Sequence, residues 1–189
     1  MYKNYKKMII KNVIIFALII LLAVFATYKI YYKFQNERKV DYNSESLEVV
    51  FHEENGDKVT LYKITPVTDG VGLSSESYEF TVKNNLTMPV NYAIKLVDDT
   101  KTIEQDNCKN RLIPKNIIKV SLKDGKENKV YNLNELENNT LKLTKIKALE
   151  EKKYIIRVWT KEDSKSERDV HYHGKIQIVE DNSDVAKAK

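Results

Sequence analysis

The amino-acid sequence predicts an all-β protein, an antiparallel, jelly-roll-like β-sandwich of about eight or nine strands preceded by a single N-terminal transmembrane helix. Two observations carry this prediction. Residues 13–28 form an apolar run without a charged side chain. Beyond residue 46, apolar residues alternate with polar ones in short runs that turn-forming segments separate. One apolar face per strand is typical of antiparallel sheets that keep the other face in water.

The first predicted element is a transmembrane signal anchor over residues 8–32. At about 1.5 Å per residue this helix is roughly 37 Å long, enough to cross a hydrocarbon core about 30 Å thick. We expect residues 1–7 to form a short basic tail in the cytoplasm and the C-terminal domain to lie outside the cell membrane. The alternative is a signal peptide that is cleaved after Ala26.

Charge supports a membrane as a partner and argues against nucleic acid. The net charge is +5, but residues 1–39 hold eight of the 32 Lys and Arg residues and one of the 27 acidic residues. The basic excess therefore flanks the apolar run, where anionic headgroups attract it, and the rest of the chain has no basic field. Basic and aromatic residues at the two ends of the helix are predicted to lie at the membrane interface: Lys11, Tyr28, Lys29, Tyr31, Tyr32 and Lys33.

A polar stalk is predicted over residues 33–45, and the extracellular β-sandwich domain over residues 46–181. The first two strands, around residues 47–51 and 58–64, flank Asn55-Gly56. This dipeptide favours a type I′ hairpin turn, so the two strands are expected to pair.

Alternation continues along the chain and predicts the remaining strands around residues 77–83, 90–96, 117–123, 130–133, 141–143, 154–160 and 172–179. Asp124-Gly125 predicts a further turn. Residues 99–107 and 134–139 have the composition of one or two helical turns each. Residues 182–189 offer nothing to bury, so we expect a disordered tail.

Several of these segments resemble a known family in their style and order: residues 64–66, 78–84, 92–99, 113–122, 154–160 and 173–179. Over about residues 46–180 they resemble the TasA and camelysin group of bacterial biofilm-matrix and cell-surface proteins. The resemblance implies an extracellular jelly roll that joins other copies edge to edge. Members of that group are similar to one another in having a cleavable signal, whereas this apolar run has the length of a retained anchor. No residue here supports the protease activity described for camelysin-like proteins.

Four residues are candidates for a metal site. His171 and His173 are two positions apart, so on a strand they share one face, opposite the predicted core, and are expected to point into solvent. Asp98 and Asp99 follow a strand, where an Asp pair also forms turns, and no calcium loop surrounds them. We therefore expect no metal and no cofactor.

The chain is not expected to be an enzyme. His52-Glu53 lacks the second histidine of the zinc-protease motif H-E-x-x-H. Cys108 is the single cysteine, so it forms no intrachain disulfide, and the pattern places no base beside it. Trp159 lies on the strand face opposite the predicted core. Together with Arg157 it is a candidate partner surface, and the alternative is that its indole packs under a loop.

These features predict a non-enzymatic, single-pass, membrane-anchored bacterial surface protein. Its sandwich is expected to mediate protein–protein or matrix interactions through a sheet edge, either with another copy or with another surface protein. One alternative is a ligand-binding accessory or sensor subunit of a membrane complex. Another is a secreted, fibre-forming matrix protein, which would follow if the apolar segment is cleaved.

Overall fold

The computed structural model describes residues 12, 15, 16, 18, 20–25, 27, 38–40 and 46–181. The chain divides into two units, Met1–Glu37 and Arg38–Lys189. All described residues from 12 to 27 are helical. A search of the described residues finds no helix that is long and apolar enough to cross a membrane. The basic tail, the interface residues, most of the stalk and the C-terminal tail lie outside the described residues.

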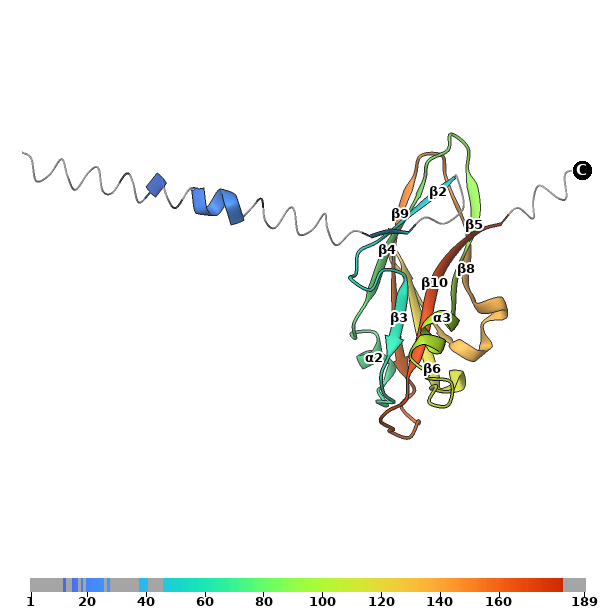
Figure 1. Cartoon of the computed structure of the whole chain (residues 1–189). Coiled ribbons are helices and arrows are strands. Elements are labelled where there is room, and N and C mark those ends of the chain that lie inside the picture. The colour runs from blue at the N-terminus through green and yellow to red at the C-terminus, as the bar shows by residue number, and fades with distance from the viewer. Residues whose placement is uncertain are drawn as a thin grey trace, which may run out of the picture. The chain divides into compact units, whose positions relative to one another are not determined.

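The second unit is a β-sandwich of two antiparallel sheets (Figure 1). One sheet has six strands in the order β1-β2-β4-β9-β6-β7, and the other has four in the order β3-β10-β5-β8. The strands are β1 Arg38–Val40, β2 Leu47–Phe51, β3 Lys58–Leu61, β4 Tyr78–Asn84, β5 Val90–Asp98, β6 Ile118–Asp124, β7 Glu127–Asn132, β8 Thr140–Ile146, β9 Glu151–Thr160 and β10 Tyr172–Glu180.

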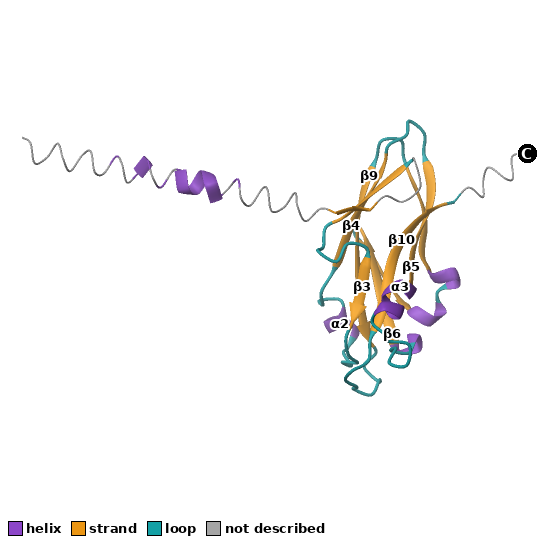
Figure 2. Ribbon diagram, in the orientation of Figure 1, coloured by secondary structure: helices purple, strands orange, loops and turns teal. Residues whose placement is uncertain are grey.

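Short helices connect some of these strands. They are α2 Asp69–Gly72, α3 Thr100–Gln105 and three 3₁₀ turns at Lys115–Ile117, Leu133–Glu135 and Glu137–Asn139. Figure 2 shows them gathered in one half of the sandwich. The prediction of a β-sandwich is confirmed, because most of the alternating segments form strands and bury one of their faces against the core.

The predicted hairpin at Asn55-Gly56 is wrong, because β2 and β3 belong to different sheets. A type I′ turn needs positive φ at both central residues. Here only Gly56 has a positive φ, +61°, and its N–H donates to the carbonyl of Glu53. The turn therefore carries the chain from one sheet to the other. At the second predicted turn, Gly125 has φ +59° and joins β6 to β7 in a true hairpin.

The strands from β3 to β10 pair as the two arms of one long hairpin. The pairs are β3 with β10, β4 with β9, β5 with β8, and β6 with β7 at the tip. Successive pairs alternate between the two sheets, so the long hairpin is rolled up around the core. β2 and then β1 extend the six-stranded sheet beyond β4.

A row of aromatic rings crosses the core. Phe51, Phe80 and Tyr154 are cross-strand neighbours on β2, β4 and β9, with ring centroids 5.7 and 5.4 Å apart. The row ends where the hydroxyl of Tyr154 lies 2.5 Å from the hydroxyl of Tyr92 on β5, in the opposite sheet. Burial raises the pKa of both tyrosines, so both stay neutral and one hydroxyl donates a hydrogen bond to the other. This hydrogen bond links the two sheets inside the apolar core.

Candidate functional site

His173 lies on the outer face of the four-stranded sheet and is nevertheless buried. Tyr172 and Ile176 of β10 point into the core, so the side chain of His173 points the other way. Its exposed fraction is 3% because α3 lies against β10 and covers this part of the outer face (Figure 1). The prediction that this imidazole points into solvent is therefore wrong. The alternation of apolar and polar residues correctly predicted which face of the sheet His173 lies on. It could not predict that α3 packs over that face.

The sequence explains where α3, the helix that covers His173, begins and ends. Asp99 precedes the helix, and its carboxylate accepts hydrogen bonds from the N–H of Thr102 at 3.2 Å and from its hydroxyl at 2.5 Å. After the helix, Asn107 has φ +51°, a left-handed conformation that asparagine tolerates. The N–H of Cys108 then donates to the carbonyl of Ile103, as in a Schellman motif. This ending turns the chain inward and buries the thiol of Cys108.

The turn brings together Asp106, Cys108 and His173. A carboxylate oxygen, the Sγ atom and a ring nitrogen lie within 4.8 Å of one another. Cys108 and His173 are buried, and Asp106 is exposed. The thiol donates a weak hydrogen bond to the backbone carbonyl of Asp106 at 3.4 Å. Neither ring nitrogen of His173 has a hydrogen-bond partner among the described residues. We call these three side chains the Asp-Cys-His cluster.

His171 lies next to the cluster. Its ring stacks on that of His173, with centroids 5.8 Å apart and 13° between the planes, and Tyr62 contacts it edge-on. The backbone around it is held by hydrogen bonds to the segment after α3: the N–H of His171 donates to Arg111 and the N–H of Ile113 donates to His171. Burial lowers the pKa of His173, which favours the neutral imidazole that can bind a metal ion.

The two aspartates proposed as metal ligands have protein partners instead. Asp98 pairs with Lys115, with Nζ and Oδ2 2.8 Å apart, and Asp99 caps α3. The sequence therefore identified His173 as a candidate metal ligand, but it did not identify Asp106 and Cys108 as its neighbours. The only sequence signal was the close spacing of Asp106 and Cys108, because their approach to His173 depends on the path of α3 over β10.

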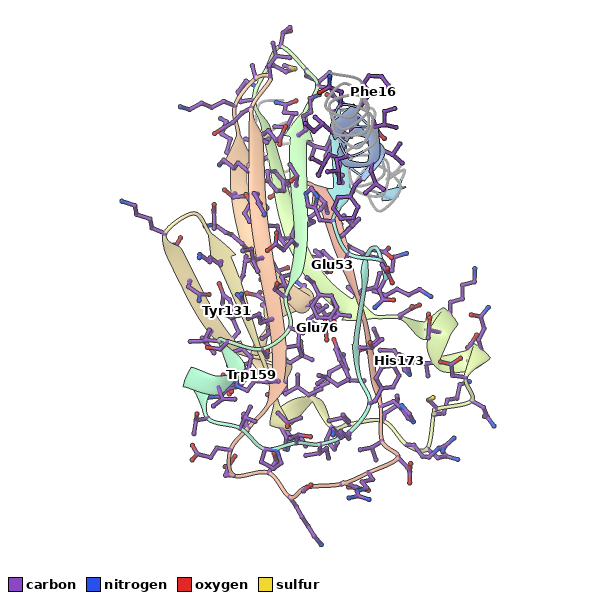
Figure 3. The ribbon with its side chains drawn as sticks, turned by 90° about the vertical axis from the view of Figure 1, so that its left-hand side faces the viewer. Phe16, Glu53, Glu76, Tyr131, Trp159 and His173 are labelled. Atoms are coloured by element: carbon purple, nitrogen blue, oxygen red, sulfur yellow. The ribbon has the colours of Figure 1, made fainter. Side chains whose placement is uncertain are left out.

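Trp159 and Arg157 lie on the outer face of the other sheet, where Figure 3 shows Trp159 beside α2. Trp159 is 3% exposed, and its indole N–H donates to Asp69 at 3.3 Å. Arg157 is half-buried, and its Nε donates to the carbonyl of Ser75 at 3.1 Å. A Cβ atom on Gly72 would lie 2.3 Å from the indole ring. An exposed partner surface at Trp159 is therefore wrong, and the alternative, packing under a loop, is what the structure has.

Gly72→Ala is expected to lift α2 off Trp159, because the added methyl group overlaps the indole ring. Overpacking of this kind lowers the free energy of unfolding by about 1–3 kcal/mol. Gly70→Ala is the matched control, since its Cβ would meet no atom closer than 3.9 Å. Denaturant unfolding measures the loss of stability. Acrylamide quenching of the single tryptophan measures its exposure, which should rise in Gly72→Ala alone. Equal behaviour of the two variants would contradict the packing.

The cluster offers a thiol, a neutral imidazole and a carboxylate in one place, which is a donor set for a transition-metal ion. Comparisons of the chain with protein-family models, with curated proteins and with solved structures find no match.

Proposed function

We propose that the chain is a non-enzymatic, single-pass, membrane-anchored bacterial surface protein whose extracytoplasmic β-sandwich mediates protein–protein or matrix contacts. The edge strand β8 carries this proposal. It pairs with β5 on one side and is the last strand in its sheet among the described residues. Such an edge presents backbone groups that another strand can pair with.

The side chains of β8 suit pairing with a second copy. Leu143 is the central residue of the strand and is 65% exposed, although it lies in a sheet. Antiparallel pairing of two β8 strands about this residue would place both Leu143 side chains next to each other, in a self-complementary contact. A hollow of about 240 Å³ borders Leu143 and is lined in part by Ala93 and Val179. A neighbouring chain would cover these apolar groups.

The jelly-roll architecture and the TasA and camelysin kinship are part of the same proposal. The pairing of β3–β10, β4–β9, β5–β8 and β6–β7 supports them, because a long hairpin rolled into two sheets is the topology of a jelly roll. In this scheme β1 and β2 are an addition at one edge of the six-stranded sheet.

The membrane anchor is supported by the helical residues of the first unit. Those that are large and hydrophobic are exposed, among them Phe16, Leu21 and Leu22. A helix with apolar side chains exposed in this way is stable in a lipid environment. Retention of this segment keeps the domain tethered, whereas cleavage after Ala26 would give the secreted, fibre-forming alternative.

A ligand-binding accessory or sensor subunit is the second candidate. A cavity of about 650 Å³ next to α2, the helix that covers Trp159, favours this role. Its lining is polar and carries both charge signs: Asp69, Lys119, Asn132, Lys161, Glu162 and Asp163. A cavity of this size suits a small polar ligand.

Topology is tested by adding protease to intact cells that produce the protein and by sequencing the N-terminus of the mature chain. The proposal expects digestion of the domain in intact cells and a mature protein that retains residues 8–32. Protection until the cells are lysed would rule out both surface roles. An N-terminus that follows Ala26 would replace the tethered protein with the secreted one.

Leu143→Glu is expected to weaken self-association of the purified chain, because it places two like charges side by side in the paired strands. Leu149→Glu is the matched control, since Leu149 is 66% exposed and lies outside β8. Analytical ultracentrifugation over a concentration series measures the effect. A chain that stays monomeric, or an equal loss of association in both variants, would contradict pairing through β8.

A further inference from the structure

We propose that Asp106, Cys108 and His173 bind a divalent ion of the zinc class, with water as the fourth ligand. The proposal goes beyond the surface role of the sandwich and does not depend on it. It rests on the geometry, burial and chemistry of the Asp-Cys-His cluster.

The buried imidazole of His173 is the observation that points to a ligand. More than nine-tenths of its surface is buried, and it is aimed away from the core toward the loop that follows α3. Buried polar groups nearly always have a hydrogen-bond partner, but neither nitrogen of this ring has one among the described residues. A bound cation would satisfy one of them, and Asp106 and Cys108 have donor atoms within 4.8 Å that could share it.

The spacing of the donor atoms fits a single ion. They lie within 4.8 Å of one another. In a tetrahedral zinc site with bonds of about 2.0–2.3 Å, ligand atoms are roughly 3.3–3.8 Å apart. The side chains therefore need to close by no more than about 1.5 Å to hold one ion.

The chemistry of the three donors selects the ion. A thiolate and an imidazole are ligands for borderline and soft cations, and one carboxylate completes a set that zinc accepts. Calcium and magnesium prefer oxygen ligands throughout. Binding converts the Cys108 thiol to a thiolate, and its proton passes to solvent.

Asp106 provides the route into the site. It is exposed, whereas Cys108 and His173 are buried behind it. Asp106 also follows the C-terminal end of α3, where the helix dipole disfavours a negative charge. A cation held at this position would offset that repulsion. It would also tie the loop after α3 to the outer face of β10 in the centre of the sheet.

Cobalt(II) tests the proposal, because a cobalt–thiolate bond gives a charge-transfer band in the near ultraviolet. The full-length chain has one cysteine, so such a band can come only from Cys108. The reduced protein is titrated with Co²⁺ and then with Zn²⁺. We expect one equivalent of Co²⁺ to produce the band and Zn²⁺ to abolish it by displacement. Zinc should also protect Cys108 from alkylation and raise the Tm.

Variants separate the cluster from adventitious binding. Asp106→Asn changes an exposed side chain and is therefore expected to leave the fold intact. It should weaken Zn²⁺ affinity by at least about 10- to 100-fold, which is the loss caused by removing a residue that only hydrogen-bonds to a metal ligand. Glu104→Gln is the matched control, since Glu104 is an exposed carboxylate two positions away outside the cluster. Cys108→Ser should remove the band, and His173→Gln should remove or strongly weaken it.

Three results would overturn the proposal. One is the lack of a charge-transfer band when the reduced, folded chain meets excess Co²⁺. Another is Zn²⁺ affinity that is the same in Asp106→Asn and in Glu104→Gln. The third is unchanged Zn²⁺ affinity in Cys108→Ser. None of these results bears on the topology of the chain or on association through β8, so this proposal and the surface function fail separately.

Discussion

The constraint on which the structure depends is the position of β10 in the middle of the four-stranded sheet. β10 is the last strand of the chain, yet it pairs with β3 on one side and with β5 on the other. This pairing closes the rolled hairpin that runs from β3 to β10. One face of the strand gives Ile176 and Ile178 to the core, and the other carries His173 to the Asp-Cys-His cluster. A single strand therefore completes the core and positions the candidate site.

Packing around β10 leaves little freedom for substitution. A Cβ atom on Gly174 would lie 2.6 Å from the hydroxyl of Tyr172, so the tyrosine side chain occupies the space that a larger residue would need. Across the core, the hydrogen bond between Tyr92 and Tyr154 joins β5, the neighbour of β10, to the six-stranded sheet. The two sheets are thus fixed to each other by apolar burial and by polar contacts, among them this tyrosine pair and the hydrogen bonds between Tyr78 on β4 and the backbone of Thr60 on β3.

The strands could be predicted from the sequence because alternation reports a local property, the burial of one strand face. Sheet membership could not, because it depends on pairing between distant segments. Asn55-Gly56 shows the difference: the dipeptide correctly marked a turn, but the turn joins two sheets instead of two paired strands. The same limit explains why the burial of side chains on the outer faces of the sheets was not predicted. Alternation placed Trp159 and His173 outside the core, but α2 and α3, which bury them, come from remote parts of the chain.

Both covered outer faces bear on function. On the four-stranded sheet, α3 covers the cluster that we assign to a metal ion, while Leu143 on the edge strand β8 stays exposed and is assigned to partner contact. On the six-stranded sheet, α2 covers Trp159 and contributes Asp69 to the polar cavity. The central claim is that β10 completes the fold by pairing with β3 and β5, and that α3 packs on it and buries His173. Native-state hydrogen exchange tests it most directly. Amides of β10 should exchange only through global unfolding. Exchange of β10 through a local opening, with β4 and β9 still protected, would contradict the claim.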